Sequence, residues 1–389
     1  MDWKINNEFS FEREKLNIIK IWWLKIDKVI LGLILFLILF GLFMNFTSSP
    51  PIARRIEVEQ LFFFKKHLIF ASISIFILIF FSYLRVNHIK LIAPPLFVII
   101  IITLILTLIF GNEIKGAKRW ISIFGFTIQP SEFAKVFFII FNAFLLDKFH
   151  DRKFYIKYGA SGISCMILVL LLILQPDFGM SFMMILLWST QLFLYGLPWL
   201  AIFMILLCAI AGVISSYILL PHVQDRVDRF FEIGNNYQVE RSIDAYINGG
   251  FFGTGPGGGL VKKHIPDSHS DFIFSVIAEE FGIIISSIII FIFLYLITVV
   301  IKKNNITKGY FSYLTISGLI IQFAAQIIIN IGVSLEMLPT KGITLPFISY
   351  GGSSLIAMSI SFGIILALTR KRYQTIIKDE ELLLSDEQD

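Results

Sequence analysis

The chain has 389 residues, of which 56% are hydrophobic and 16% charged, with a formal net charge of +5. Soluble domains carry about 25% charged residues, so this composition excludes an ordinary soluble enzyme and indicates a protein with several membrane spans. Nucleic-acid binding is also excluded, because it needs a soluble basic surface. Cys165 and Cys208 lie in apolar segments, where a thiol behaves as a small hydrophobe. Neither a disulfide nor a thiolate metal site is predicted.

Residues 1–28 mix cations with acids and are predicted to form a cytoplasmic N-terminal segment. A hydrocarbon core of about 30 Å requires about 20 apolar residues per helix. The uncharged run 178–224 is too long for one span, and the YGLP sequence at 195–198 divides it. We therefore predict an all-α fold with ten transmembrane helices, near 29–46, 67–84, 91–110, 131–146, 159–175, 178–195, 198–220, 271–301, 310–335 and 346–369.

These spans predict one integral membrane domain, residues 29–369, with a large periplasmic loop at 221–270 between the seventh and eighth spans. Residues 370–389 are predicted to be a disordered cytoplasmic tail. With the N-terminus inside, inner segments carry 19 Lys and Arg residues and outer loops 13. Because positive charge accumulates on the cytoplasmic side, this bias favours an orientation with both termini inside.

A glycine-dense sequence, GGFFGTGPGGG, occupies residues 249–259 of the large loop. Bare backbone N–H groups of such a loop can wrap an anion. No Lys-Ser/Thr pair follows at the spacing of a nucleotide-binding loop, however, which makes a nucleotide site a poor explanation. A flexible flap over a lipid-linked substrate fits better, and simple loop flexibility remains open.

Asp271 follows this loop and is predicted to lie on the first turn of the helix 271–301, which also contains Glu279 and Glu280. An ionisable group at membrane depth costs about 2.5–3.5 kcal/mol, so it is retained mainly where it faces a cavity. Asp271 could simply cap the helix. Its neighbours Asp267, His269, Lys262, Lys263 and His264 favour a functional site instead. A carboxylate partly removed from water can serve as a general base.

Glu132 and Lys135 lie three residues apart and therefore on one face of a predicted helix. They could pair with each other, or they could line a polar cavity with Lys118 and Arg119 available for phosphate oxygens.

Two further sites carry weaker signals. Asp177, in a very short predicted outer turn, could cap the next helix or face the same cavity. Lys341 leads into LPFISYGGSS at 345–354, where small residues favour close helix packing.

Four motifs together resemble the shape, elongation, division and sporulation (SEDS) family of FtsW and RodA proteins. They are GAKRWISIFGFTIQPSEFAK, QPDFG, GFFGTGPGGGLVKKHIPDSHSDFIFSVIAEEFG and LPTKGITLPFISYGGSS. The last motif, and an SSPP run at 48–51, are more similar to the FtsW branch. Family members often have Glu where this chain has Gly258.

The resemblance implies a peptidoglycan glycosyltransferase that polymerises lipid II at the outer face of a bacterial inner membrane, at the division septum. It also implies partnership with a class B penicillin-binding transpeptidase and other division proteins. The family's motif residues fall on Asp271, Glu132, Lys135 and Asp177.

On this resemblance we expect an inverting transfer in which Asp271 deprotonates the acceptor sugar. Lys118, Arg119 and Lys135, or a divalent cation (Mg²⁺ or Mn²⁺) held mainly by phosphate, would offset the charge of the leaving diphosphate. The expected substrate-binding residues are Lys118, Arg119, Glu132, Lys135, Asp177, His269 and Lys341. A lipid II flippase and a non-enzymatic division scaffold are the alternatives.

Overall fold

The ten predicted spans all coincide with helices in the computed structural model, which describes residues 18–114, 117–123, 126–219, 224, 237–307, 309–339 and 342–370. The helices are α3 (Lys28–Arg55), α4 (Phe62–Ser82), α5 (Val86–Phe110), α6 (Pro130–Lys148), α7 (Phe154–Leu174), α8 (Phe178–Tyr195), α9 (Trp199–Leu219), α12 (Ile273–Asn304), α13 (Tyr310–Ser334) and α14 (Gly352–Leu368). Within these described residues, seven helices are long and apolar enough to cross a membrane. The polytopic membrane fold is confirmed, while the span count and the orientation stay predictions.

Smaller elements lie outside these ten helices. A short helix, α2 (Ile18–Lys25), precedes α3 in the predicted cytoplasmic segment. Strands β1 (Asn112–Ile114), β2 (Ala117–Ile123) and β3 (Phe126–Ile128) form an antiparallel sheet in the order β1-β2-β3, a departure from an all-α chain. The large loop contains α11 (Tyr237–Gly249) and a 3-10 turn, η1 (Val261–Lys263). The predicted tail lies outside the described residues after position 370.

Two helix starts differ from the prediction. α12 begins at Ile273 with Phe272 as its N-cap residue, so placing Asp271 on the first turn was wrong. α14 begins at Gly352 rather than near residue 346, because the preceding residues form turns that pack against α3.

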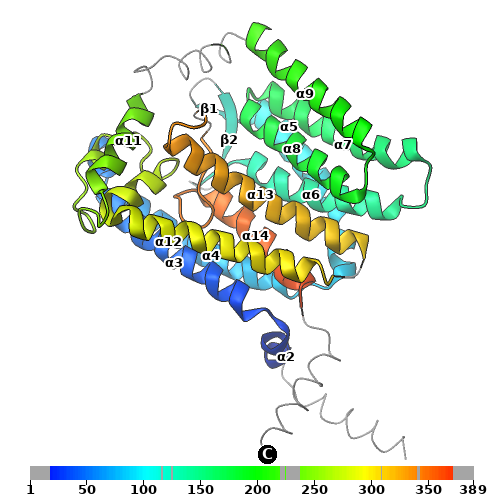
Figure 1. Ribbon diagram of the computed structural model, residues 1–389, viewed down its shortest axis with the longest axis horizontal. Coiled ribbons are helices and arrows are strands. Elements are labelled where there is room, and N and C mark those ends of the chain that lie inside the picture. The colour runs from blue at the N-terminus through cyan, green and yellow to red at the C-terminus, as the bar shows by residue number, and fades with distance from the viewer. Residues whose placement is uncertain are drawn as a thin grey trace, which may run out of the picture.

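The centre of the bundle is formed by α13 and α14, with the other long helices around them (Figure 1). α14 packs so closely on α4 that a Cβ at Gly352 would lie 2.5 Å from the Phe70 ring, and one at Gly363 would lie 2.7 Å from the carbonyl oxygen of Leu78. The packing explanation is therefore confirmed for Gly352 at the start of α14.

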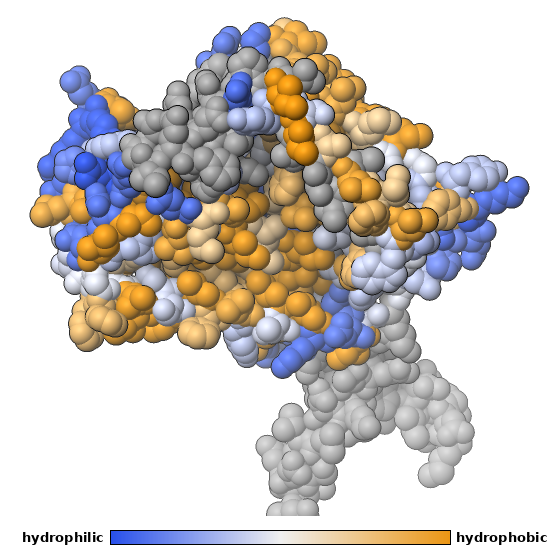
Figure 2. Space-filling model, turned by 45° about the horizontal axis from the view of Figure 1, so that its top comes forward, coloured by the Kyte–Doolittle hydropathy of each residue, from blue (hydrophilic) through white to orange (hydrophobic). Residues whose placement is uncertain are grey.

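The hydrophobic and hydrophilic residues occupy separate regions of the protein surface. Figure 2 shows hydrophilic residues gathered at opposite edges of the molecule and a broad hydrophobic region between them. α11 and the glycine-dense loop lie together at one end of the bundle, on the left in Figure 1. The start of α12, just after Asp271, lies at the same end.

Gly41 of α3 gives a test of the packing. A Cβ there would lie 2.6 Å from the carbonyl oxygen of Phe347, whereas a Cβ at Gly32 of the same helix would meet nothing within 4 Å. We expect Gly41→Ala to destabilise the protein by about 1–3 kcal/mol through overpacking. Gly32→Ala should be neutral or stabilising by up to about 1 kcal/mol, because glycine is unfavourable inside a helix. Thermal unfolding in detergent measures both, and equal midpoints would contradict the close approach.

Candidate active site

Asp271 lies in a turn just before α12 and is half-buried. Its main-chain oxygen accepts a hydrogen bond from Asn330 Nδ2 at 2.8 Å, and the same amide donates to the carbonyl oxygen of Ile343 at 2.7 Å. The carboxylate oxygen Oδ2 lies 3.4 Å from the position of a Cβ at Gly342. Asn330 of α13 thus fixes the Asp271 turn against the segment that leads to α14.

The capping explanation for Asp271 is not supported. Phe272 occupies the N-cap position of α12, and no side-chain capping hydrogen bond is made there.

His269 packs as an aromatic residue. Its ring centroid lies 4.6 Å from that of Phe63 and 5.0 Å from that of Tyr350, and its main-chain oxygen accepts a hydrogen bond from Tyr350 N at 2.8 Å. Burial lowers the pKa of His269 to about 4, although Asp267 acts in the opposite direction. The imidazole is therefore neutral at pH 7, and its Nδ1 is buried without a hydrogen-bond partner among the described residues.

Glu132 and Lys135 form a buried ion pair at 3.0 Å near the start of α6. Mutual pairing, the simpler of the two explanations, is confirmed. The Lys135 side chain is fully buried, so its charge is already matched inside the bundle.

Arg119 and Asp177 form a second pair beside the first. Arg119 Nη1 lies 3.8 Å from Asp177 Oδ1, and the guanidinium also donates to the main-chain oxygens of Gln175 and Pro176. Asp177 caps α8 by accepting from Met180 N. Burial raises the pKa of Asp177, Arg119 opposes that shift, and the charges of Glu132 and Lys135 also act on it. We call Arg119, Glu132, Lys135 and Asp177 the charged cluster.

The segment 342–354 connects Asp271 with α6, the helix that carries part of the charged cluster. It begins beside Asp271 at Gly342, and Thr344 Oγ1 donates to Ser354 Oγ at 2.8 Å. Ser353 Oγ then accepts from Gln129 N, at the start of α6. Of the other predicted substrate-binding residues, Lys118 is exposed on β2 opposite Glu113. Lys341 lies outside the described residues.

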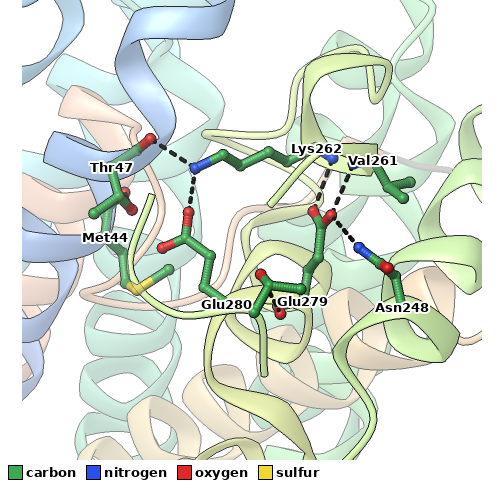
Figure 3. A network of polar contacts seen from close by, with 8 residues as sticks. Met44, Thr47, Asn248, Val261, Lys262, Glu279 and Glu280 are labelled. Carbon is green, nitrogen blue, oxygen red and sulfur yellow. Dashed lines mark hydrogen bonds and ion pairs between the residues drawn. The ribbon is translucent and has the colours of Figure 1, made fainter. Parts of the chain in front are cut away.

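A buried network holds the glycine-dense loop against α12 (Figure 3). The Glu279 carboxylate accepts hydrogen bonds from Val261 N at 2.7 Å, Lys262 N at 2.8 Å and Asn248 Nδ2 at 2.9 Å. The Lys262 ammonium pairs with Glu280 and donates to the main-chain oxygen of Thr47 at 3.0 Å. Both side chains of the Lys262–Glu280 pair are almost fully buried.

The glycines of this loop allow close backbone approach. Thr254 N and Gly255 N donate to the main-chain oxygens of Glu279 and Glu280. At Gly282, where φ is 73°, α12 is kinked, and a Cβ would lie 2.3 Å from the carbonyl oxygen of Phe251. These bonds do not support a freely moving flap. The sequence signal that could have revealed the network was the adjacent pair of acids ahead of a glycine in an apolar helix.

The fold and the site define a polytopic membrane protein with a carboxylate-centred site at one end of its helix bundle. The chain belongs to the FtsW/RodA/SpoVE family: the sequence pattern described as "Cell cycle protein" matches residues 27–374.

Relatives extend over almost the whole chain. A protein of Caulobacter vibrioides named "Probable peptidoglycan glycosyltransferase FtsW" is 36% identical over 94% of this chain and 95% of its own length. The protein of the same name from Pseudoalteromonas translucida is 36% identical over 87% of this chain and 88% of its own.

Solved structures share the fold. A chain from the structure called "Structural coordination of polymerization and crosslinking by a peptidoglycan synthase complex" has a TM-score of 0.76 and 25% identity, covering 90% of this chain and 99% of that one. Rod shape determining protein RodA of Thermus thermophilus has a TM-score of 0.68 and 24% identity, covering 90% of this chain and 99% of that one. This similarity shows a shared fold alone.

The coupling between Lys262 and Glu280 can be tested by a double-mutant cycle on the stability of the protein. Lys262→Met leaves the Glu280 carboxylate buried without its cation, and breaking a buried pair costs about 3–5 kcal/mol. Lys262→Met combined with Glu280→Leu should recover most of that loss because no charge stays uncompensated. Thermal unfolding of the single and double variants measures the cycle. If the losses of Lys262→Met and Glu280→Leu simply add, the two side chains are not coupled.

Proposed function

We propose that the chain is a peptidoglycan glycosyltransferase that polymerises lipid II during septal wall synthesis, at the outer face of the bacterial inner membrane. The names of the relatives support the activity. The observation that carries the proposal is Asp271: a half-buried carboxylate in a turn tied to α13 and the segment after it, at the end of the bundle.

Asp271 is the general base. It takes the proton of the sugar 4-hydroxyl of an acceptor lipid II, whose oxygen forms a bond to the anomeric carbon of the donor glycan. The bond from that carbon to the diphosphate oxygen breaks, and undecaprenyl diphosphate leaves with the electron pair. One displacement inverts the anomeric centre, and the main-chain bond from Asn330 holds the Asp271 turn in place.

The leaving diphosphate requires positive charge. Lys118 is exposed and Arg119 is partly exposed, so these two cations can reach phosphate oxygens. The Lys135 ammonium is buried against Glu132, and its role is to balance that carboxylate. Lys341 and His269 stay predicted substrate contacts, with the His269 ring held between Phe63 and Tyr350.

A divalent cation, Mg²⁺ or Mn²⁺, enters as an ion carried by the substrate. Within the described residues, no three His, Cys, Asp or Glu side chains lie together as a metal site. Diphosphate oxygens are good ligands for Mg²⁺, and the ion would offset their charge.

A class B penicillin-binding transpeptidase is the proposed partner, with other division proteins around it. The solved peptidoglycan synthase complex, whose name joins polymerization with crosslinking, supports a partner of this kind.

The decisive variant is Asp271→Asn. We expect polymerisation of labelled lipid II to fall by about 10²- to 10⁴-fold, as for loss of a general base. Asp267→Asn is the matched control, four residues earlier in the same loop, because Asn tolerates the positive φ of 55° at that position. Gel electrophoresis of the products, with the transpeptidase present, measures both.

Full polymerisation by Asp271→Asn would contradict the assigned role. Translocation of lipid II into liposomes without glycan products would indicate a flippase. Growth supported by Asp271→Asn in cells would indicate a scaffold.

Chelation tests the substrate-borne cation. We expect EDTA to stop polymerisation and Mg²⁺ to restore it, while the unfolding temperature of the substrate-free protein stays unchanged, because the ion would enter with the substrate. A fall in that temperature on chelation would instead indicate a resident metal.

A further inference from the structure

A hollow of about 780 Å³ lies between the end of α3 and the glycine-dense loop, and no residue of the charged cluster lines it. Its apolar lining includes Phe43, Phe46, Leu61 and Pro256. The two phenylalanine side chains are about half exposed, at 43% and 46%. An apolar surface of this kind, next to a membrane-spanning helix, is suited to a lipid chain.

Three cations line the same hollow, and one of them, Lys262, is buried and paired with Glu280. Arg54 and Lys263 are exposed, and neither side chain has an ion pair or hydrogen bond within the described residues. In the part of the chain that the structure describes, no acid belongs to the lining. The acids nearest to Arg54 along the chain are Glu57, which is exposed, and Glu59, which pairs with Lys65. The hollow therefore has an unbalanced positive charge beside an apolar wall.

Side-chain contacts hold the two walls together. The Lys262 ammonium donates to Thr47 of α3 and pairs with Glu280 of α12. The Arg55 guanidinium donates to the main-chain oxygen of Lys263. The backbone segments that carry Arg54 and Lys263 are thus bonded to each other across the hollow, and both cations line it before any ligand binds.

We propose that this hollow binds the diphosphate of an isoprenoid lipid, with the isoprenoid chain along Phe43 and Phe46 and the diphosphate between Arg54 and Lys263. A diphosphate carries at least two negative charges and matches two cations, whereas a phosphatidylglycerol headgroup carries one. The identification of the lipid rests on the proposed function, in which the lipid diphosphate of the donor is released and that of the acceptor is retained.

The hollow would hold one of the two lipid-linked molecules that the proposed reaction requires. Asp271 takes its proton from one lipid-linked sugar, and a second lipid-linked molecule must be held at the same time. One continuous segment joins the hollow to Asp271, because Pro256, Gly257, Lys262 and Lys263 form part of the hollow's wall and the chain then leads directly to position 271. No bond is made or broken in the hollow.

Binding of geranylgeranyl diphosphate to the full-length protein in detergent tests the proposal without requiring polymerisation. The double variant Arg54→Ala/Lys263→Ala should weaken binding by at least about tenfold, because two charge-assisted contacts are lost. Arg54→Lys/Lys263→Arg keeps both charges and should bind within about threefold of the unmodified chain. Arg241→Ala is the matched control, a partly exposed arginine already paired with Asp244, and should change nothing.

Asp271→Asn separates this inference from the proposed function. It should bind the diphosphate as the unmodified chain does, whatever its polymerisation activity. Unchanged affinity in the double alanine variant would overturn the proposal. Displacement of the probe by an equal concentration of phosphatidylglycerol would also overturn it, since the site would then select any anionic lipid. A thermal unfolding midpoint for each variant shows that the protein is folded.

Discussion

The Glu279 carboxylate determines where the glycine-dense loop lies. It accepts two main-chain N–H groups and one side-chain amide, all within 2.9 Å, in a site from which water is excluded. Charge-assisted bonds in a low-dielectric environment are strong, and leaving their donors unpaired would be costly. Because Val261 and Lys262 are fixed in this way, the Lys262 side chain is directed toward Glu280 and α3. The position of the loop at Val261 and Lys262 therefore follows from one of the two adjacent acids of α12.

Pairing explains most of the charges that lie at membrane depth. The Glu132–Lys135 and Lys262–Glu280 pairs are both buried, and each balances a carboxylate that could not otherwise leave water. Such residues can be essential without touching a substrate. Asp271 differs because it is only half-buried and lies in a turn rather than inside a helix. This difference in environment separates the proposed base from the structural acids.

The long helices could be predicted because each requires about 20 apolar residues, a signal that local sequence carries. The Glu132–Lys135 pair was also predictable, since residues three apart meet on a helix. The Lys262–Thr47 contact joins positions 215 residues apart, and no local pattern reveals such a partner. α11 was missed because it is polar on one face and has no long apolar run. The start of α12 was misplaced because an Asp near a helix start resembles an N-cap.

The loop therefore links the position of the hollow to the position of Asp271. Lys262 and Lys263 lie at the hollow, and eight residues later the same segment carries Asp271, whose turn Asn330 holds from the opposite side. Glu279 fixes the segment at its beginning and Asn330 fixes it at its end. A disturbance at Glu279 must consequently displace Lys262 and Lys263 of the hollow and shift the base together. A disturbance of the Glu132–Lys135 pair acts on α6 and the charged cluster, and leaves both anchors of the loop in place.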